Sequence, residues 1–380
     1  MTSEQFEREL FPLWRGNSVY RETVMFIGKH DHAPLLYTPT EILSVTSYDG
    51  EVVYVEGVDY ACNERGVLTL LENTRIPYIE ESAYYHDDPT SLISLPYKGK
   101  ETFVYWGEGT TMTRWQIAVT YTHAEVPIAP PACHKERFAD FLAKMERGED
   151  VTVLFYGDSI TKGANSSYAC ETPPFLAPWS MLCTEYLARR YEFCERFIDT
   201  GLEPALAVPK KTLPFGNCGT LTFINTAVGG WKSEDGLLHL QERVLDQIAT
   251  YGCDLMVFAF GMNDKYITVE EHVENMRAMI DRVVAVAPNT SVLLVSPMYP
   301  NPASKRWCTV QPKFEEADKV LVEECMSKGT PCAIVPMTTM SAQVLKRKRF
   351  CDYSGNNINH PNDFMMRLYA QTLLQTLVGY

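Results

Sequence analysis

Four short blocks of this sequence carry residues that could perform nucleophilic acyl chemistry. The first block, residues 151–161, is an apolar run that stops at Gly157, Asp158 and Ser159. The run has no polar alternation and so predicts a strand buried on both faces, and open α/β sheets bind ligands at the carboxyl ends of such strands. A helix that begins there would point its first amides at the ligand. Ser159 is therefore a candidate nucleophile, although Gly-Asp-Ser could also be only a turn with a helix cap.

Three later blocks add groups that would complement a nucleophile. Residues 223–231 form an apolar run that enters two glycines, where the backbone can approach a ligand closely and expose an N–H. Residues 255–264 form another apolar run, followed by an asparagine whose side chain offers N–H donors. Residues 355–363 present a histidine just before the last amphipathic segment, and the proline after it suits the first turn of a helix. Together the blocks supply a nucleophile, two oxyanion donors and a base.

The order Ser, Gly, Asn, His over residues 150–380 resembles the SGNH (GDSL-like) hydrolase superfamily, which is named after these four residues. The resemblance implies that Ser159 attacks an ester carbonyl and that His360 serves first as general base and then as general acid. It also implies an oxyanion hole made of the Ser159 amide, the Gly230 amide and the Asn263 side chain. Each such donor is typically worth roughly 10²–10³ in rate.

The histidine block departs from the family at one position. The family usually carries Asp three residues before the histidine, where this chain has Asn357. The amide of Asn357 could accept a hydrogen bond from the ring and orient it, but would give little electrostatic support to an imidazolium. In serine proteases the comparable Asp→Asn change costs about 10⁴-fold in rate. A Ser159–His360 dyad with the ring held by a backbone carbonyl is the preferred reading, because some carbohydrate esterases of the superfamily lack the acid. The alternative is a triad completed by another acid, of which Asp352 and Asp363 are the candidates.

Residues beside the four blocks are candidates for lining the substrate pocket. They are Asp158, which is expected mainly to order the turn, together with Lys162, Gly229, Trp231 and Met262. Gly229 also competes with Gly230 for the oxyanion role, and spacing favours Gly230 only modestly.

The segment that carries the blocks alternates between strand and helix patterns. Two further apolar runs, at 291–296 and 332–336, bring the expected parallel strands to five. Helical patterns are expected at 177–190, 233–250, 269–287, 313–328 and 363–377. This alternation predicts a three-layer α/β/α, flavodoxin-like domain over 150–380, which is also the architecture that the resemblance implies. The insert at 202–219, rich in Pro, Gly and Lys, is expected to form a loop near the site.

Residues 1–125 have a different pattern. Short alternating segments recur without helical patterns between them, and the Asp-Gly pair at 49–50 is a hairpin signature. An all-β sandwich domain, jelly-roll-like in type, is expected here. Residues 126–149 would form a proline-rich linker and a connecting helix at 135–147. The 380-residue chain is thus expected to have two domains.

Composition excludes several classes of function. The net charge of −14 argues against nucleic-acid and anionic-membrane partners. The basic run at 346–349 is expected to be a solvated face or a helix end. Apolar runs are too short for a membrane span, and the first residues lack a secretory pattern. Eleven cysteines, an odd number without Cys-x-x-Cys spacing, favour reduced thiols in the cytoplasm.

The sequence therefore predicts a serine esterase that removes short acyl groups, above all O-acetyl, from carbohydrates. Its partner would be a small-molecule or oligosaccharide ester. No metal or organic cofactor is expected, because protein groups supply the nucleophile, the base and the oxyanion hole. The alternatives are a lipase, thioesterase or arylesterase of the same superfamily, and a carbohydrate-binding protein with a decayed site. Exposed sandwich edges are compatible with a homo-oligomer.

Overall fold

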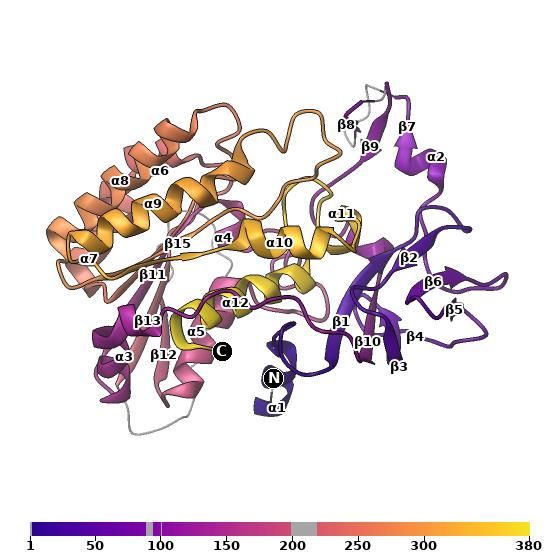
Figure 1. Cartoon of the computed structure of the whole chain (residues 1–380), viewed down its shortest axis with the longest axis horizontal. Helices are drawn as coiled ribbons and strands as arrows, with labels where there is room; N and C mark the ends of the chain where they lie inside the picture. The colour runs from indigo at the N-terminus through magenta and orange to yellow at the C-terminus, as the bar shows by residue number, and fades with distance from the viewer. Residues whose placement is uncertain (1, 89–93, 100, 199–218) are drawn as a thin grey trace.

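The computed structural model describes residues 2–88, 94–99, 101–198 and 219–380. Two parts of the chain fold around different kinds of sheet, and they are called here the N-terminal region (residues 2–125) and the α/β region (150–380) (Figure 1). The insert expected to form a loop lies outside the described residues except for Gly219, which donates its backbone N–H to the carbonyl oxygen of Gly148 at 2.8 Å.

The α/β region is built on a six-stranded parallel sheet in the order β12-β13-β11-β14-β15-β16. The strands are β11 (Val151–Gly157), β12 (Cys194–Ile198), β13 (Thr220–Asn225), β14 (Leu255–Ala259), β15 (Ser291–Val295) and β16 (Cys332–Val335). The expectation of five strands missed β12. This strand is at the edge of the sheet, and its sequence includes two charged residues rather than a continuous apolar run.

The central strand β11 is buried on both faces, as its sequence predicts. Val153 and Phe155 pack into the core on one side of the sheet, whereas Leu154 and Tyr156 pack into the core on the other side. Because β11 pairs with β13 on one edge and β14 on the other, the strand order reverses at β11. Ligands of open α/β sheets bind at the carboxyl end of such a switch point, and this is where Ser159 lies.

Helices cover both faces of this sheet, which gives the expected three layers (Figure 1). One face carries α6 (Ser233–Leu238), the π-helical turn η3 (Gln241–Leu245), α7 (Asp246–Tyr251), α8 (Val269–Val286) and α9 (Phe314–Ser327). The other face carries η2 (Lys135–Phe138), α3 (Ala139–Glu146), α5 (Trp179–Arg190) and α12 (Asp363–Val378). Shorter helices are α4 (Ser159–Lys162), η4 (Gln311–Lys313), α10 (Met337–Leu345) and α11 (Phe350–Tyr353).

The N-terminal region contains antiparallel sheets, as expected for an all-β region. A four-stranded sheet has the order β1-β10-β3-β4, and two three-stranded sheets have the orders β2-β6-β5 and β7-β9-β8. The Asp-Gly turn joins β3 to β4, and Gly50 there has a φ of 84°. The strands are β1 (Ser18–Met25), β2 (His32–Pro34), β3 (Pro39–Ser47), β4 (Val53–Tyr54), β5 (Tyr60–Cys62), β6 (Val67–Leu70), β7 (Tyr85–His86), β8 (Ser94–Pro96), β9 (Phe103–Tyr105) and β10 (Gln116–His123). Short helices are α1 (Ser3–Glu9), α2 (Glu81–Tyr84) and η1 (Thr113–Trp115).

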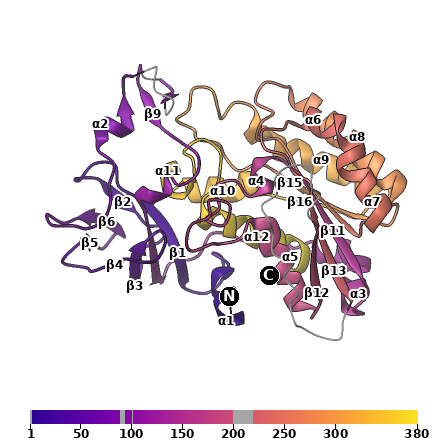
Figure 2. The ribbon, with the colours of Figure 1, turned by 180° about the vertical axis from the view of Figure 1, so that it is seen from behind.

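The two regions share one hydrophobic core and a buried polar interface. Helix α11 of the α/β region contacts β1 of the N-terminal region, and both views show it at the boundary between the two (Figures 1 and 2). Lys348 and Glu22 form an ion pair of 2.7 Å across the interface, and both side chains are completely buried. Part of the basic run at 346–349 is therefore not a solvated face; the run follows the end of α10 and connects the two regions.

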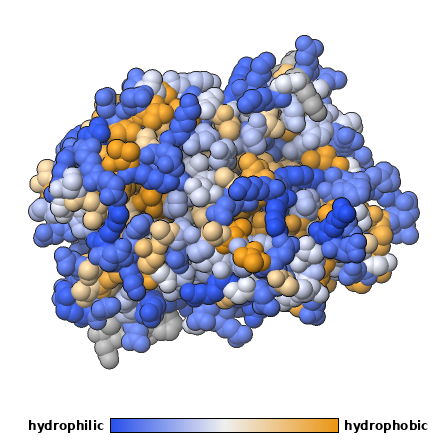
Figure 3. Space-filling model, viewed as in Figure 1, coloured by the Kyte–Doolittle hydropathy of each residue, from blue (hydrophilic) through white to orange (hydrophobic). Residues whose placement is uncertain are grey.

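The surface is mixed in polarity. On the face seen in Figure 3, hydrophilic residues predominate and hydrophobic residues form small separate groups. Within the described residues, no helix combines the length and the apolar character needed to cross a membrane.

Candidate active site

Ser159 lies at the turn between β11 and α4. The backbones of β11 and β14 approach so closely at Gly157 that a Cβ there would lie 2.5 Å from the carbonyl oxygen of Ala259. Asp158 is the N-cap of α4, and its carboxylate accepts a hydrogen bond of 2.9 Å from the Ile160 amide. Glycine and an N-capping residue thus set the direction in which the Ser159 side chain leaves the sheet.

The loop before α12 holds His360 in place. The side-chain oxygen of Asn356 accepts hydrogen bonds from the backbone amides of residues 358, 359 and 360, at 2.9, 3.0 and 3.0 Å. The Ser354 hydroxyl donates to the His360 carbonyl oxygen at 2.9 Å. Asn362 then caps α12 by accepting from the Met365 amide at 3.3 Å. This closed loop brings the His360 ring to the carboxyl edge of the sheet.

The Ser159 hydroxyl lies 2.8 Å from the Nε2 atom of His360. Both residues are nearly buried: Ser159 is 7% exposed, and the His360 side chain is 11% exposed. A hydroxyl within hydrogen-bond distance of an imidazole nitrogen is the geometry of a serine nucleophile and its general base. The structure therefore brings together the two residues that the sequence selected for these roles.

The other ring nitrogen of His360 faces two oxygen acceptors. Its Nδ1 atom lies 2.7 Å from Oδ1 of Asn165 and 3.0 Å from Oε2 of Glu108. Both acceptors favour the tautomer with the proton on Nδ1, which leaves Nε2 free to accept the Ser159 proton. This is the tautomer that a general base requires.

The orientation of Asn165 is set by its own surroundings. Its side-chain nitrogen donates to the carbonyl oxygens of Gly109 and Gly355, at 3.0 and 3.2 Å, so its oxygen must face the ring. Asn165 has a φ of 65°, a left-handed conformation that asparagine tolerates better than most residues. A side chain at Gly355 would overlap Asn165, so glycine is required at this position.

Glu108 reaches the histidine from the N-terminal region. It lies in the loop between β9 and η1, and its Oε1 atom accepts a hydrogen bond of 3.0 Å from the Asn356 side chain. Its side chain is 54% exposed. Burial raises the pKa of the Glu108 carboxyl, but the hydrogen bond and charge of His360 outweigh this effect and lower it. Glu108 thus remains a carboxylate beside the ring.

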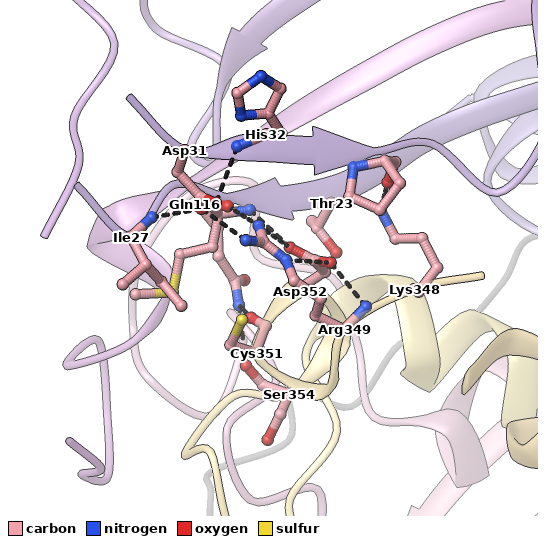
Figure 4. Close-up of polar contacts among 12 residues, drawn as sticks. Thr23, Ile27, Asp31, His32, Gln116, Lys348, Arg349, Cys351, Asp352 and Ser354 are labelled. Atoms are coloured by element: carbon pink, nitrogen blue, oxygen red, sulfur yellow. Dashed lines mark hydrogen bonds and ion pairs between the residues drawn. The ribbon is translucent and has the colours of Figure 1, made fainter. Parts of the chain in front are cut away.

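The residues expected to orient His360 lie elsewhere. Asp352 is completely buried at the interface between the regions, where it accepts from the Met25 amide at 3.0 Å and pairs with Arg349 at 3.1 Å (Figure 4). Asp363 accepts a hydrogen bond of 2.8 Å from the Ser167 amide. Asn357 donates to the Tyr84 hydroxyl and the Tyr105 carbonyl. The place expected for these residues, or for a backbone carbonyl, is taken by Asn165 and Glu108.

The candidate oxyanion donors lie on two neighbouring loops. Asn263 donates from its side chain to the Trp231 carbonyl oxygen at 3.0 Å, which ties it to the glycine loop. Gly229 and Gly230 are exposed. A Cβ at Gly229 would lie 3.8 Å from the Ser159 Cβ, and Gly230 has a φ of 80°. The loops therefore lie beside the nucleophile, and the assignment of Gly230 and Asn263 as donors stays a prediction.

A buried charged cluster links the same two loops. Asp264 accepts a hydrogen bond from the Ser233 amide at 2.9 Å and lies 2.6 Å from Nδ1 of His272. The Nε2 atom of His272 lies 3.4 Å from Asp318. Burial lowers the pKa of His272, but the two carboxylates outweigh burial and raise it to about 9. This cluster fixes Asn263 relative to the start of α6.

The pocket candidates differ in exposure. Asp158 and Met262 are 2% and 1% exposed and line a small cavity beneath the site. Burial raises the pKa of Asp158 to about 7. Lys162 is half-buried, and Trp231 is half-buried with its ring stacked on His239 at 4.8 Å between centroids. Among the residues that the structure describes, no group of three or more His, Cys, Asp or Glu side chains could hold a metal ion.

Three residues that contact His360, Glu108, Asn165 and Asn356, were missed by sequence reasoning. Asn165 and Asn356 lie close in sequence to Ser159 and His360, so their proximity was a usable signal. Glu108 is separated from His360 by 252 residues, and its surrounding glycines indicate only a turn.

Residues 155–368 match the model of the GDSL-like Lipase/Acylhydrolase family. No curated protein matches the chain. Among solved structures, a two-domain esterase (CEX) active on acetylated mannans is 19% identical, with a TM-score of 0.44 over 65% of this chain and 53% of that chain. The chain thus spans about half the length of that esterase.

Two shorter proteins are similarly remote in structure. A lipase/acylhydrolase from Enterococcus faecalis is 20% identical, with a TM-score of 0.38 over 59% of this chain and 94% of that chain. A variant of Axe2, an acetyl xylan esterase from Geobacillus stearothermophilus, is 14% identical, with a TM-score of 0.41 over 60% of this chain and 94% of that chain.

Proposed function

The chain belongs to the GDSL-like lipase/acylhydrolase family, and on this basis we propose that it hydrolyses short-chain acyl esters, above all O-acetyl esters of carbohydrates. Ser159 is the proposed nucleophile and His360 the proposed base. The single observation that carries the proposal is the 2.8 Å contact between the Ser159 hydroxyl and Nε2 of His360, whose other nitrogen faces two oxygen acceptors.

In the first half of the reaction, His360 takes the hydroxyl proton of Ser159 on Nε2 while the serine oxygen attacks the ester carbonyl carbon. The carbonyl oxygen becomes an anion, which the amides of Ser159 and Gly230 and the side chain of Asn263 stabilise. When the intermediate collapses, His360 gives its proton to the departing sugar oxygen, and the acyl group stays on Ser159.

In the second half, a water molecule attacks the acyl carbon while His360 removes a proton from it. The tetrahedral intermediate collapses, His360 returns the proton to the serine oxygen, and the carboxylic acid leaves. Protein groups carry each of these steps.

The preference for sugar esters is supported by aromatic side chains beside the oxyanion residues. Trp231 follows Gly230 directly and is half-buried, and Tyr266 lies three residues after Asn263 and is 77% exposed. The exposed Tyr266 ring offers a stacking surface to the apolar face of a sugar, whereas the Trp231 ring already stacks on His239. The cysteines at 62, 133, 170, 183, 253, 308, 325, 332 and 351 are free thiols, which supports the expectation that the protein works in a reducing compartment such as the cytoplasm.

The test is hydrolysis of p-nitrophenyl acetate, butyrate and octanoate by the wild type and by Ser159→Ala. Acetate-selective turnover that disappears in the variant supports the proposal, and acetate release from acetylated oligosaccharides then identifies the sugar. If octanoate is hydrolysed faster than acetate, the proposal of a short-chain esterase is wrong and a lipase activity replaces it. Equal rates for the two proteins would rule out Ser159 as the nucleophile.

A further inference from the structure

We propose that Glu108 is the acidic partner of His360, so that the N-terminal region completes the catalytic site of the α/β region. The inference rests on the proposed serine esterase mechanism. It assigns the missing acid of the triad to a loop 252 residues away in sequence from the histidine.

The carboxylate of Glu108 is held at both oxygens. Oε2 faces Nδ1 of His360 at 3.0 Å, and Oε1 accepts from the Asn356 side chain at 3.0 Å. The Asn356 side-chain oxygen also accepts from the backbone amide of His360, and the Asn356 carbonyl oxygen accepts from the Gly107 amide at 3.2 Å. Asn356 therefore sets the position of the Glu108 carboxylate relative to the His360 ring. Such a fixed arrangement is not expected of a surface side chain that approaches the ring by chance.

The loop that carries Glu108 is itself constrained. The Thr111 hydroxyl donates to the Glu108 carbonyl oxygen at 2.7 Å, and a side chain at Gly107 would collide with Thr111. The Gly109 carbonyl oxygen accepts from Asn165, the second residue that contacts the ring. Three consecutive residues of this loop thus contact groups that hold the histidine.

Asn357 explains why the acid comes from the other region. At the position where the family usually has Asp, its side-chain nitrogen donates to the Tyr84 hydroxyl at 2.9 Å and to the Tyr105 carbonyl at 2.7 Å. Tyr105 ends β9, three residues before Glu108. An aspartate could not donate these bonds. In the family this position usually supplies the acid. In this chain Asn357 instead anchors β9, the strand that leads to Glu108.

Glu108 and Asn165 have separable effects on the ring. Asn165 is neutral, so it can fix the tautomer and orientation but contributes little to the stability of the imidazolium. The Glu108 charge favours the imidazolium that forms when Ser159 gives up its proton. Because the Glu108 side chain is 54% exposed, solvent and salt screen this attraction. Its loss should therefore cost less than the 10⁴-fold seen in serine proteases.

The experiment compares the full-length wild type with Glu108→Gln, Glu108→Asp and the control Glu101→Gln on p-nitrophenyl acetate. Glu101 is another exposed glutamate of the same region. We expect Glu108→Gln to lower kcat by roughly 10- to 100-fold with KM within about twofold, and Glu108→Asp to be intermediate. The acid limb of the pH–rate profile should move to lower pH in Glu108→Gln only, because the carboxylate no longer favours the protonated base. High salt should narrow the gap between wild type and variant.

A Glu108→Gln variant with wild-type kcat and an unmoved acid limb would overturn the inference and leave a dyad oriented by Asn165. A melting temperature equal to that of the wild type separates a chemical effect from unfolding. If Glu108→Gln melts at a lower temperature than the wild type, the pH–rate profile distinguishes a chemical role from a structural one. A purely structural role lowers the rate by the same factor at every pH and does not move the acid limb. If Ser159→Ala loses activity while Glu108→Gln keeps the wild-type kcat and acid limb, this inference is wrong but the proposed function stands.

Discussion

The side chain of Asn357 donates a hydrogen bond of 2.7 Å to the carbonyl oxygen of Tyr105, across the boundary between the α/β region and the N-terminal region. The side chain is fully buried, so both of its N–H groups depend on protein acceptors. The bond holds the end of β9 beside the loop that presents His360. Catalytic geometry and the docking of the two regions thus depend on the same asparagine.

Replacing Asn357 by Asp should therefore destabilise the interface. The variant would leave the Tyr105 carbonyl without its donor and bury an unpaired carboxylate, at a cost of roughly 2 kcal/mol or more in the free energy of unfolding. Urea denaturation at neutral pH measures the change, with Asn289→Asp, on an exposed turn, as the control. Equal stability of the Asn357→Asp variant and the wild type would contradict the structural role.

The parts of the site that follow from the sequence are those with local signals. The apolar run before Gly157 predicts a buried strand because a strand in the middle of a parallel sheet contacts apolar layers on both faces. Ser159 follows it directly, so its place at the carboxyl edge of the sheet could be inferred. The same reasoning places Asn263 after β14, and the amphipathic pattern after His360 predicts α12.

Other parts depend on contacts between distant segments. Glu108 is exposed and follows a glycine, so nothing in its neighbourhood distinguishes it from a turn residue until the chain has folded. Lys348 belongs to a basic run that predicts solvation, yet it is buried because Glu22 of the N-terminal region neutralises it. Edge strand β12 has a buried phenylalanine before it but charged residues within it, so its pattern is weak.

Replacing Asn165 by Ala should lower kcat while leaving the acid limb of the pH–rate profile near its wild-type position. The ring would lose the 2.7 Å contact that fixes its orientation, but the Glu108 carboxylate would still face Nδ1. We expect a loss of roughly 10-fold or more in kcat. Steady-state kinetics from pH 5 to 9 test this, and a shifted acid limb would show that the two acceptors are not separable.

Replacing Asp158 by Asn should stabilise the protein at alkaline pH. Burial raises the pKa of Asp158 from 3.8 to about 7, so the folded state binds this proton more tightly than the unfolded state. The Asp158 contribution to stability is therefore lost as the pH rises from about 4 through 7. The amide oxygen of Asn can still accept from the Ile160 amide and carries no charge.

The variant should thus match the wild type near pH 4 and exceed it at pH 8, by at most about 4 kcal/mol in the free energy of unfolding. Denaturant titrations at the two pH values measure this difference, with Asp87→Asn at an exposed position as the control. A variant that is less stable than the wild type at pH 8 would mean that the Asp158 carboxylate, as a charged group, supports the turn before Ser159.

The wild type should lose stability between neutral and alkaline pH as His272 loses its proton, and His272→Gln should not show this loss. The pKa of His272 is raised from 6.5 to about 9, because the two carboxylates outweigh burial. The protonated histidine therefore contributes stability that is complete below about pH 6.5 and is lost as the pH rises through 9. The wild type should lose roughly 1–3 kcal/mol of unfolding free energy over this interval through this residue.

In His272→Gln this fall in unfolding free energy should be absent. The variant should also be markedly less stable than the wild type at pH 6.5, because Asp264 and Asp318 then repel each other without a cation between them. Since Asp264 holds the Ser233 amide beside the loop of Gly230 and also follows Asn263, kcat should fall more than KM rises. His30→Gln, a change at an exposed histidine, should alter neither quantity. A His272→Gln variant with wild-type kcat would show that the loops of Gly230 and Asn263 keep their geometry without the buried cluster.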